Sequence, residues 1–151
     1  EICDTLITSA QSNQLPIPFF IRLLFQESGF KPDVISRAGA QGIAQFMPET
    51  ASRVGLENPF DPMQAIAASA RLLRDLVNQF GNLGLAAAAY NAGPRRIQDW
   101  LARNPALRKD HYRSARGELE GGHRRHSTSE CAARSALSGS HRSGSCERAA
   151  T

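Results

Sequence analysis

One carboxylate is placed by the sequence on the apolar face of an expected helix. This face begins just after Pro18 and carries side chains at i, i+3, i+4 and i+7, which are Phe20, Leu23, Leu24 and Glu27. Burial disfavours the charged form of a carboxyl group, and the negative end of its own helix adds to that effect, so the pKa of Glu27 is predicted to be raised. A carboxyl group of this kind suits general acid catalysis.

A structural interpretation of Glu27 stands beside the catalytic one. The side chain could turn to solvent at a frayed helix end, or pair with Arg22 or Arg37. From the helix pattern alone, this interpretation is the more common one for a lone Glu.

The elements that must hold this carboxyl are predicted to be helices. They are expected at about residues 2–14, 18–28, 48–54, 62–80, 85–92 and from 94 onward. Asp61 is expected to cap the long fourth helix. Its buried face is predicted to be Ile66, Ala70, Leu73, Val77 and Phe80. Gly81 and Gly84 are expected to break the chain before the fifth helix, whose small side chains place it in the middle of the domain.

The segment between the second and third helices lacks helical periodicity. Pro32, Gly39 and Gly42 predict an irregular loop or hairpin excursion, with residues 42–46 as a brief extended stretch. The fold class is therefore all-α, with one irregular excursion.

Composition divides the chain at about residue 105. Residues 1–105 hold all seven Phe and the one Trp, whereas residues 106–151 hold all four His and only three large aliphatic residues. The second part cannot bury enough apolar surface to offset chain entropy, so it is expected to be a basic, disordered tail. Because the net charge of +4 belongs to this tail, the folded part is not expected to bind an anionic partner such as nucleic acid. The tail could touch nucleic acid or an acidic cell wall, but a solvated segment without a partner is the more common case.

Three segments resemble the signatures of the soluble lytic transglycosylase family, in the same order. They are Gln26-Glu27-Ser28-Gly29-Phe30, Gly39-Ala40-Gln41-Gly42-Ile43-Ala44-Gln45-Phe46-Met47-Pro48 and Ala89-Tyr90-Asn91-Ala92-Gly93-Pro94. Each is weak alone, but together they are specific. The resemblance implies a lysozyme-like fold of the goose type, α+β with minimal strand content, in residues 1–105. With this resemblance, the catalytic interpretation of Glu27 becomes more favoured than the structural one.

The resemblance also implies roles for individual residues. Glu27 is the single catalytic residue, and Ser28, Gln45, Tyr90 and Asn91 bind the substrate in the same cleft. Each binding residue has a structural alternative: Ser28 or Asn91 can complete a helix end, Gln45 can hold the excursion together, and Tyr90 can lie in the core.

The implied reaction is non-hydrolytic cleavage of peptidoglycan glycan strands between N-acetylmuramic acid and N-acetylglucosamine, which leaves 1,6-anhydro ends. Ordinary glycosidases use two carboxylates, and the three segments supply one. A hydrolytic lysozyme would need a second acid such as Asp33 or Glu49, and a non-catalytic glycan-binding or assembly module is the other alternative.

No metal or organic cofactor is expected. The resemblance implies a periplasmic or cell-envelope location, with a secretion or wall-remodelling complex as a potential partner, although the chain starts with Glu1 and shows neither a signal peptide nor a membrane span. Members of the family continue into a further Tyr-containing helix that has no match here. Residues from about Arg108 onward are therefore expected not to be the family's own C-terminus.

Overall fold

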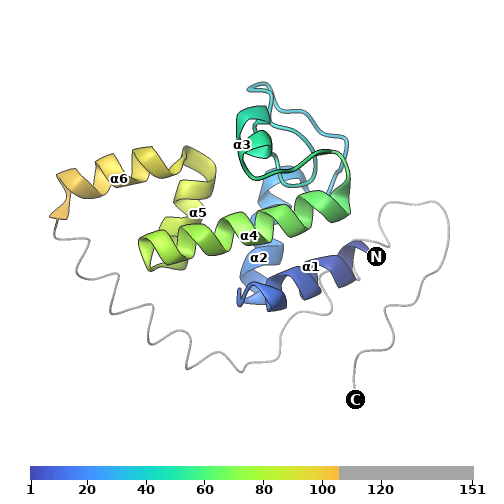
Figure 1. Cartoon of the computed structure of the whole chain (residues 1–151), viewed down its shortest axis with the longest axis horizontal. Helices are drawn as coiled ribbons and strands as arrows, with labels where there is room; N and C mark the ends of the chain where they lie inside the picture. Colours follow the sequence, from blue (N-terminus) through green and yellow to red (C-terminus); the bar gives the residue numbers. More distant parts are fainter. Residues whose placement is uncertain (106–151) are drawn as a thin grey trace, which may run out of the picture.

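The computed structural model describes residues 1–105, which form six α-helices and no β-strand. The helices are α1 (Ile2–Ser12), α2 (Ile17–Ser28), α3 (Pro48–Arg53), α4 (Pro62–Phe80), α5 (Leu83–Ala92) and α6 (Pro94–Arg103). The long α4 crosses the middle of the molecule, with α1 below it, α3 and the excursion above its N-terminal half, and α5 and α6 near its C-terminal end (Figure 1). The predicted helical domain with one irregular excursion is confirmed. The expected tail lies outside the described residues, as does the prediction about residues from Arg108 onward.

The ends of α4 show why the sequence predicted this helix well. The Asp61 side chain accepts hydrogen bonds from the backbone N–H groups of Met63 and Gln64, at 2.9 and 3.2 Å. These bonds satisfy two donors that have no partner inside the helix, and they lower the pKa of Asp61. Gly81 ends the helix in the left-handed conformation with a φ of 70°.

The hydrophobic core lies along α4, where α1 and α5 pack against it. The predicted face of α4 is confirmed for Ile66, Ala70 and Leu73, which are fully buried. Val77 and Phe80 are only partly buried, and Leu76 is buried in their place. Other helices and the excursion add fully buried side chains to the same core, among them Leu6, Phe20, Leu24 and Ile43.

The prediction that Gly84 breaks the chain before the fifth helix was wrong. The Asn82 side chain accepts a hydrogen bond of 3.0 Å from the Leu85 N–H group, so α5 begins at Leu83 and includes Gly84 in its first turn. A side-chain cap thus overrides the weak helix propensity of one glycine. The buried Ala86 and Ala89 allow the close contact of α5 with α4 that the small side chains indicated.

The excursion between α2 and α3 is a tight loop held by backbone hydrogen bonds. Gln41 forms isolated antiparallel bridges with Ile35 and Phe46. The expected extended stretch at residues 42–46 was wrong, because the chain turns there and Gly42 and Gln45 both have positive φ, 74° and 49°. Non-glycine residues seldom adopt this conformation, so the residue type at position 45 did not indicate a turn.

Gly42 also lies against the turn that precedes α4. A Cβ atom built at Gly42 would lie 1.9 Å from the Pro59 carbonyl oxygen. Only glycine permits this approach, so the excursion can rest on the start of α4 only with this residue at position 42.

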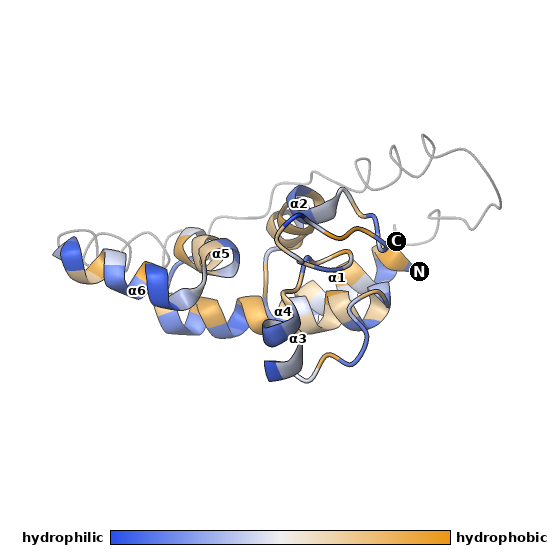
Figure 2. Cartoon of the chain, turned by 90° about the horizontal axis from the view of Figure 1, so that it is seen from above, coloured by the Kyte–Doolittle hydropathy of each residue, from blue (hydrophilic) through white to orange (hydrophobic). Residues whose placement is uncertain are grey.

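Figure 2 shows both hydrophobic and hydrophilic residues along the helices, including α6, which contributes no buried residue. None of the helices in residues 1–105 combines the length and the hydropathy that a membrane crossing requires.

Candidate active site

Glu27 lies in the last turn of α2, where the helix meets the excursion. Phe20, Leu23 and Leu24 are buried on the same face, and the Glu27 side chain is partly buried. Gly29, with a φ of 63°, ends the helix two residues later. The predicted position of Glu27 on the apolar face is therefore confirmed.

The environment of Glu27 keeps its proton bound more tightly than in water. Burial raises the pKa of the Glu27 carboxyl, because the charged form loses hydration. Within residues 1–105 it forms no ion pair, and both Arg22 and Arg37 are exposed. The alternative in which Glu27 pairs with one of these arginines is thus absent from the described part of the chain.

Ser28 joins the end of α2 to the excursion. Its hydroxyl donates a hydrogen bond of 2.7 Å to the Ile43 carbonyl oxygen. This bond connects the residue after Glu27 to the buried part of the excursion, because Ile43 is fully buried. Ser28 therefore has a positioning contact, and a direct contact with substrate stays a prediction.

Tyr90 connects α5 to the same loop. Its hydroxyl donates a hydrogen bond of 2.9 Å to the Ala44 carbonyl oxygen and lies 3.0 Å from the Ser69 hydroxyl. Its ring packs against Phe46 with the ring centroids 6.3 Å apart. Burial raises the pKa of Tyr90, the hydrogen bond with Ser69 offsets part of this effect, and the charge of Glu27 adds a smaller increase.

Gln45 is turned toward its own loop. Its side-chain amide donates hydrogen bonds to the Val34 and Gly42 carbonyl oxygens, at 3.2 and 2.9 Å. Both amide protons therefore hold the excursion, as the structural alternative predicted. The amide oxygen is the part of this side chain that can meet a ligand, so a cleft-lining role for Gln45 stays a prediction.

Asn91 has no hydrogen bond with the excursion among the described residues, unlike Ser28, Gln45 and Tyr90. It is exposed in the last turn of α5, and its amide donates a hydrogen bond of 3.3 Å to the Ala87 carbonyl oxygen of the same helix. Its substrate-binding role also stays a prediction.

Ser69 contacts a candidate site residue, Tyr90, and was not predicted from the sequence. It is fully buried in the middle of α4 and contacts the Tyr90 hydroxyl. One signal was present: Ser69 follows Ile66 by three residues and precedes Leu73 by four, so it is a polar residue on the apolar stripe.

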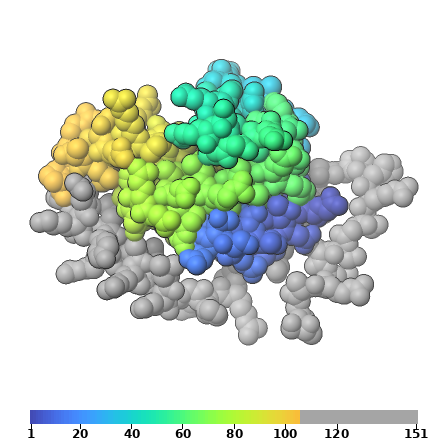
Figure 3. Space-filling view, viewed as in Figure 1, coloured from blue at the N-terminus to red at the C-terminus, as the bar shows by residue number. Residues whose placement is uncertain are grey.

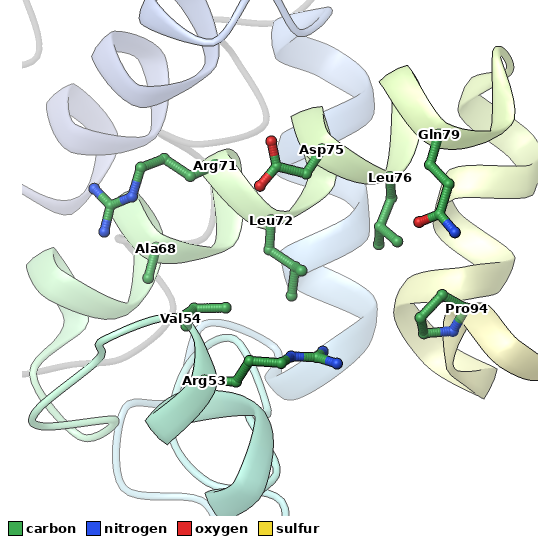
Figure 4. A pocket seen from close by; sticks show the side chains of 9 residues that line it. All are labelled: Arg53, Val54, Ala68, Arg71, Leu72, Asp75, Leu76, Gln79 and Pro94. Carbon is green, nitrogen blue, oxygen red and sulfur yellow. The ribbon is translucent and has the colours of Figure 1, made fainter.

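A separate groove lies over α4, between the end of α3 and the start of α6, where Figure 3 shows the surface hollowed. It has a volume of about 370 Å³ and is lined by Arg53, Val54, Ala68, Arg71, Leu72, Asp75, Leu76, Gln79 and Pro94. In Figure 4 the Arg53 side chain extends below Leu72 and Leu76, between α3 and Pro94, whereas the Arg71 side chain extends away from them. None of the five predicted site residues lines this groove. Elsewhere in residues 1–105, no three His, Cys, Asp or Glu residues gather as metal ligands would.

Comparison with protein families gives a match that covers most of the chain. The profile described as the Transglycosylase SLT domain matches residues 4–113. The soluble lytic murein transglycosylase of Escherichia coli strain K12 is 36% identical over 108 residues, which are 64% of this chain and 17% of that protein. The transglycosylase of Enterobacteria phage PRD1 is 38% identical over 77 residues, which are 51% of this chain and 29% of the phage protein. The chain thus spans less than a third of either relative.

Two solved structures share the fold. The inactive mutant of the lytic transglycosylase Slt from Pseudomonas aeruginosa has a TM-score of 0.61 and 34% identity, over 65% of this chain and 18% of that one. The 70 kDa soluble lytic transglycosylase from Escherichia coli has a TM-score of 0.63 and 26% identity, over 78% of this chain and 22% of that one. The predicted lysozyme-like architecture is confirmed.

Proposed function

The chain belongs to the Transglycosylase SLT domain family, and from this membership we propose that it is the catalytic domain of a lytic murein transglycosylase with Glu27 as its acid and base. The observation that carries the assignment of Glu27 is its position at the end of α2, partly buried and without an ion pair in the described residues, beside the loop of the second signature segment. The Pseudomonas aeruginosa neighbour is an inactive mutant in which glutamine replaces a glutamate. The activity of that enzyme therefore requires this glutamate.

The proposed reaction needs one carboxyl group. Protonated Glu27 gives its proton to the glycosidic oxygen between N-acetylmuramic acid and N-acetylglucosamine, and the bond from C1 of the muramic acid to this oxygen breaks. The 2-acetamido group stabilises the positive charge that develops at C1. The Glu27 carboxylate then takes the proton of the C6 hydroxyl of the muramic acid while that oxygen bonds to C1. The products are a free 4-hydroxyl on one sugar and a 1,6-anhydro ring on the other, and no water is consumed.

Burial of Glu27 favours the first of these steps. A carboxyl group with a raised pKa is protonated at higher pH and so can act as an acid nearer to neutrality. After Glu27 donates the proton, its carboxylate remains partly buried and is therefore a stronger base than the carboxylate of an exposed Glu. One residue can therefore serve both steps.

The substrate class sets the place of action. Glycan strands of the cell wall lie in the cell envelope, so we propose that the domain acts in the periplasm or elsewhere in the envelope. A secretion or wall-remodelling complex would bring the domain to the wall.

The proposal is tested by comparing three variants of the full chain on purified sacculi. Glu27→Gln keeps the shape of the side chain but has no proton to give, so the release of soluble fragments is expected to fall at least about 10²-fold. Asp33→Asn and Glu49→Gln are matched controls, because both residues are exposed carboxylates on the excursion and on α3, and they are expected to retain the parent rate.

Circular dichroism verifies that each variant is folded. A Glu27→Gln variant that still digests sacculi at the parent rate would contradict the assignment of Glu27. Loss of activity in Asp33→Asn or Glu49→Gln would instead indicate a second catalytic carboxylate, as in a hydrolytic lysozyme.

A further inference from the structure

The α6 helix is the one helix of residues 1–105 that has no buried residue. It lies at the edge of the molecule and packs mainly against α5 (Figures 1 and 2). Ile97 packs against the hydrophobic core and so attaches the helix to the domain. The rest of the α6 surface is free to meet a partner.

The apolar face of α6 carries Ile97, Trp100 and Leu101, at i, i+3 and i+4. Ile97 and Leu101 are partly buried, whereas Trp100 is 41% exposed. One exposed hydrophobic residue is ordinary on a protein surface. Trp100 therefore indicates a contact surface only in combination with its neighbours.

Arginine residues lie beside this exposed ring. Arg96 precedes Trp100 by four residues and Arg103 follows it by three, so both are its neighbours on the helix surface. With Arg95, the helix holds three Arg and one acidic residue, Asp99. All three Arg are exposed, and none forms an ion pair within residues 1–105. The free surface of α6 is thus both apolar and positively charged.

The total charge of the folded part conceals this local excess. Residues 1–105 hold nine basic and nine acidic residues. However, residues 62–105 hold five Arg and two Asp, whereas residues 1–61 hold four basic and seven acidic residues. The expectation that the folded part binds no anionic partner depends on the total alone. The distribution of charge favours an anionic partner at α6.

An anionic leaflet of a lipid membrane matches both properties of this surface. Trp is enriched where headgroups meet acyl chains, because its ring is apolar and its N–H group is polar. Arg side chains can reach headgroup phosphates while their methylene groups stay on apolar surface. Helices that lie flat on membranes combine a cationic polar face with an aromatic and aliphatic face, as α6 does.

Three other occupants fit this surface less well. Residues 106–151 hold nine basic and five acidic residues and only three large aliphatic ones, so their net charge has the same sign as that of α6. A second copy packed through the same helix would bring the arginines of both helices together. A hydrated anionic polymer could pair with the arginines, but it has no hydrocarbon layer to receive Trp100.

We propose that α6 rests on the surface of an anionic membrane leaflet. Trp100 and Leu101 enter the boundary between headgroups and acyl chains, and Arg96 and Arg103 contact the lipid phosphates. The contact is reversible and sensitive to salt, because only a small apolar area is exposed and the attraction of the arginines is screened by ions. This inference does not depend on the proposed function.

The first test uses the fluorescence of the full chain, in which Trp100 is the only Trp. Vesicles made of equal parts of phosphatidylcholine and phosphatidylglycerol are expected to move the Trp100 emission to shorter wavelength, because the ring leaves water. A spin-labelled lipid in these vesicles should quench that emission. Vesicles of phosphatidylcholine alone, or anionic vesicles in about 1 M salt, should leave the emission nearly unchanged.

The second test compares two double variants by sedimentation with the same anionic vesicles. Arg96→Gln with Arg103→Gln removes two charges beside Trp100, so the affinity for the vesicles is expected to fall about tenfold or more. Arg22→Gln with Arg37→Gln is the matched control, because it removes the same charge from exposed residues of α2 and the excursion. The control should keep most of the parent affinity.

Four results would overturn the proposal. The chain could sediment with anionic vesicles while the Trp100 emission stays unchanged, which would place the contact elsewhere in the chain. The two double variants could lose affinity equally, which would show that charge at any position suffices. Without vesicles, Trp100 could already emit at short wavelength and resist quenching by acrylamide, which would mean that another segment or a second copy covers it. Finally, sacculi could shift the emission when vesicles do not, which would identify an anionic polymer as the partner. None of these measurements uses cleavage, so each holds whether or not the proposed function is correct.

Discussion

The α4 helix and the excursion at residues 30–47 show two different ways of holding a chain in place. α4 is 19 residues long, has seven buried residues, and begins at the Asp61 cap and ends at Gly81. The excursion has no regular ladder, and it depends on single hydrogen bonds and on close backbone approach at Gly42. Burial is spread over many contacts in α4, whereas a few polar contacts determine the shape of the excursion.

The candidate active site lies where the excursion meets α2 and α5. Glu27 is placed by α2, and the loop is fixed to this helix by the contact of Ser28 with Ile43 and to α5 by the contact of Tyr90 with Ala44. Changes in the core should therefore affect mainly stability, and changes in the excursion should affect activity more than stability.

Leu73→Ala is expected to have the largest effect on stability. Leu73 is fully buried in α4, and its truncation leaves a cavity that destabilises a domain by about 2–5 kcal/mol. The melting temperature measured by circular dichroism should fall by roughly 10 °C or more. Below the transition, the rate per folded molecule on sacculi should stay near that of the parent. A loss of activity without a loss of stability would break the division between the two regions.

Gly42→Ala is expected to have a smaller effect on stability and a larger one on activity. The new methyl group would meet the Pro59 carbonyl oxygen, so the excursion must shift, at a cost of about 2 kcal/mol in addition to the cost of the positive φ at this position. Because the Ile43 and Ala44 carbonyl groups move with it, digestion of sacculi should slow well beyond what the fraction unfolded explains.

Gly39→Ala is the matched control for this change. Gly39 also has a positive φ, 87°, but no atom lies within 4 Å of the position that a methyl group would take there. The Gly39→Ala variant should lose only about 1 kcal/mol of stability, because alanine is strained at a positive φ, and it should keep the parent activity. Equal activity losses in the two variants would show that the approach to Pro59 is not what positions the loop.

The smallest effect expected is a stabilisation by Glu27→Gln that depends on pH. The pKa of Glu27 is raised in the folded state, so the folded protein binds this proton more tightly than the unfolded chain. The parent therefore loses stability as the pH rises from the ordinary Glu pKa through the raised value, and the Gln variant does not. Thermal melts at several pH values should show a higher melting temperature for the variant at neutral pH and convergence in acid. A difference that stays constant with pH would indicate that Glu27 is not perturbed by burial.

The same contrast explains which features could be predicted from the sequence. Repetitive signals indicated α2 and α4, because apolar spacing, Pro at the helix starts and Gly at the ends all agree. The position of Glu27 on a buried face followed directly. The start of α5 did not, because one side-chain contact from Asn82 decided it.

The contacts of the candidate site residues could not be predicted from the sequence. Gln45 and Tyr90 were identified by their resemblance to a family signature, but the positive φ of Gln45 and its bonds to Val34 and Gly42 depend on the folded loop. Ser69 was missed because its partner lies 21 residues away on another helix. The spacing of apolar residues predicts which face of a helix a residue occupies. It does not predict which polar group of another helix that residue will contact.

Mass spectrometry of the fragments released from purified peptidoglycan tests the central claim most directly. Glu27 acting without a second carboxylate should give fragments that end in 1,6-anhydro-N-acetylmuramic acid, one water lighter than the hydrolytic products. Digestion in heavy-oxygen water should leave these ends unlabelled. Reducing ends that carry the heavy oxygen would contradict the account and identify a hydrolase.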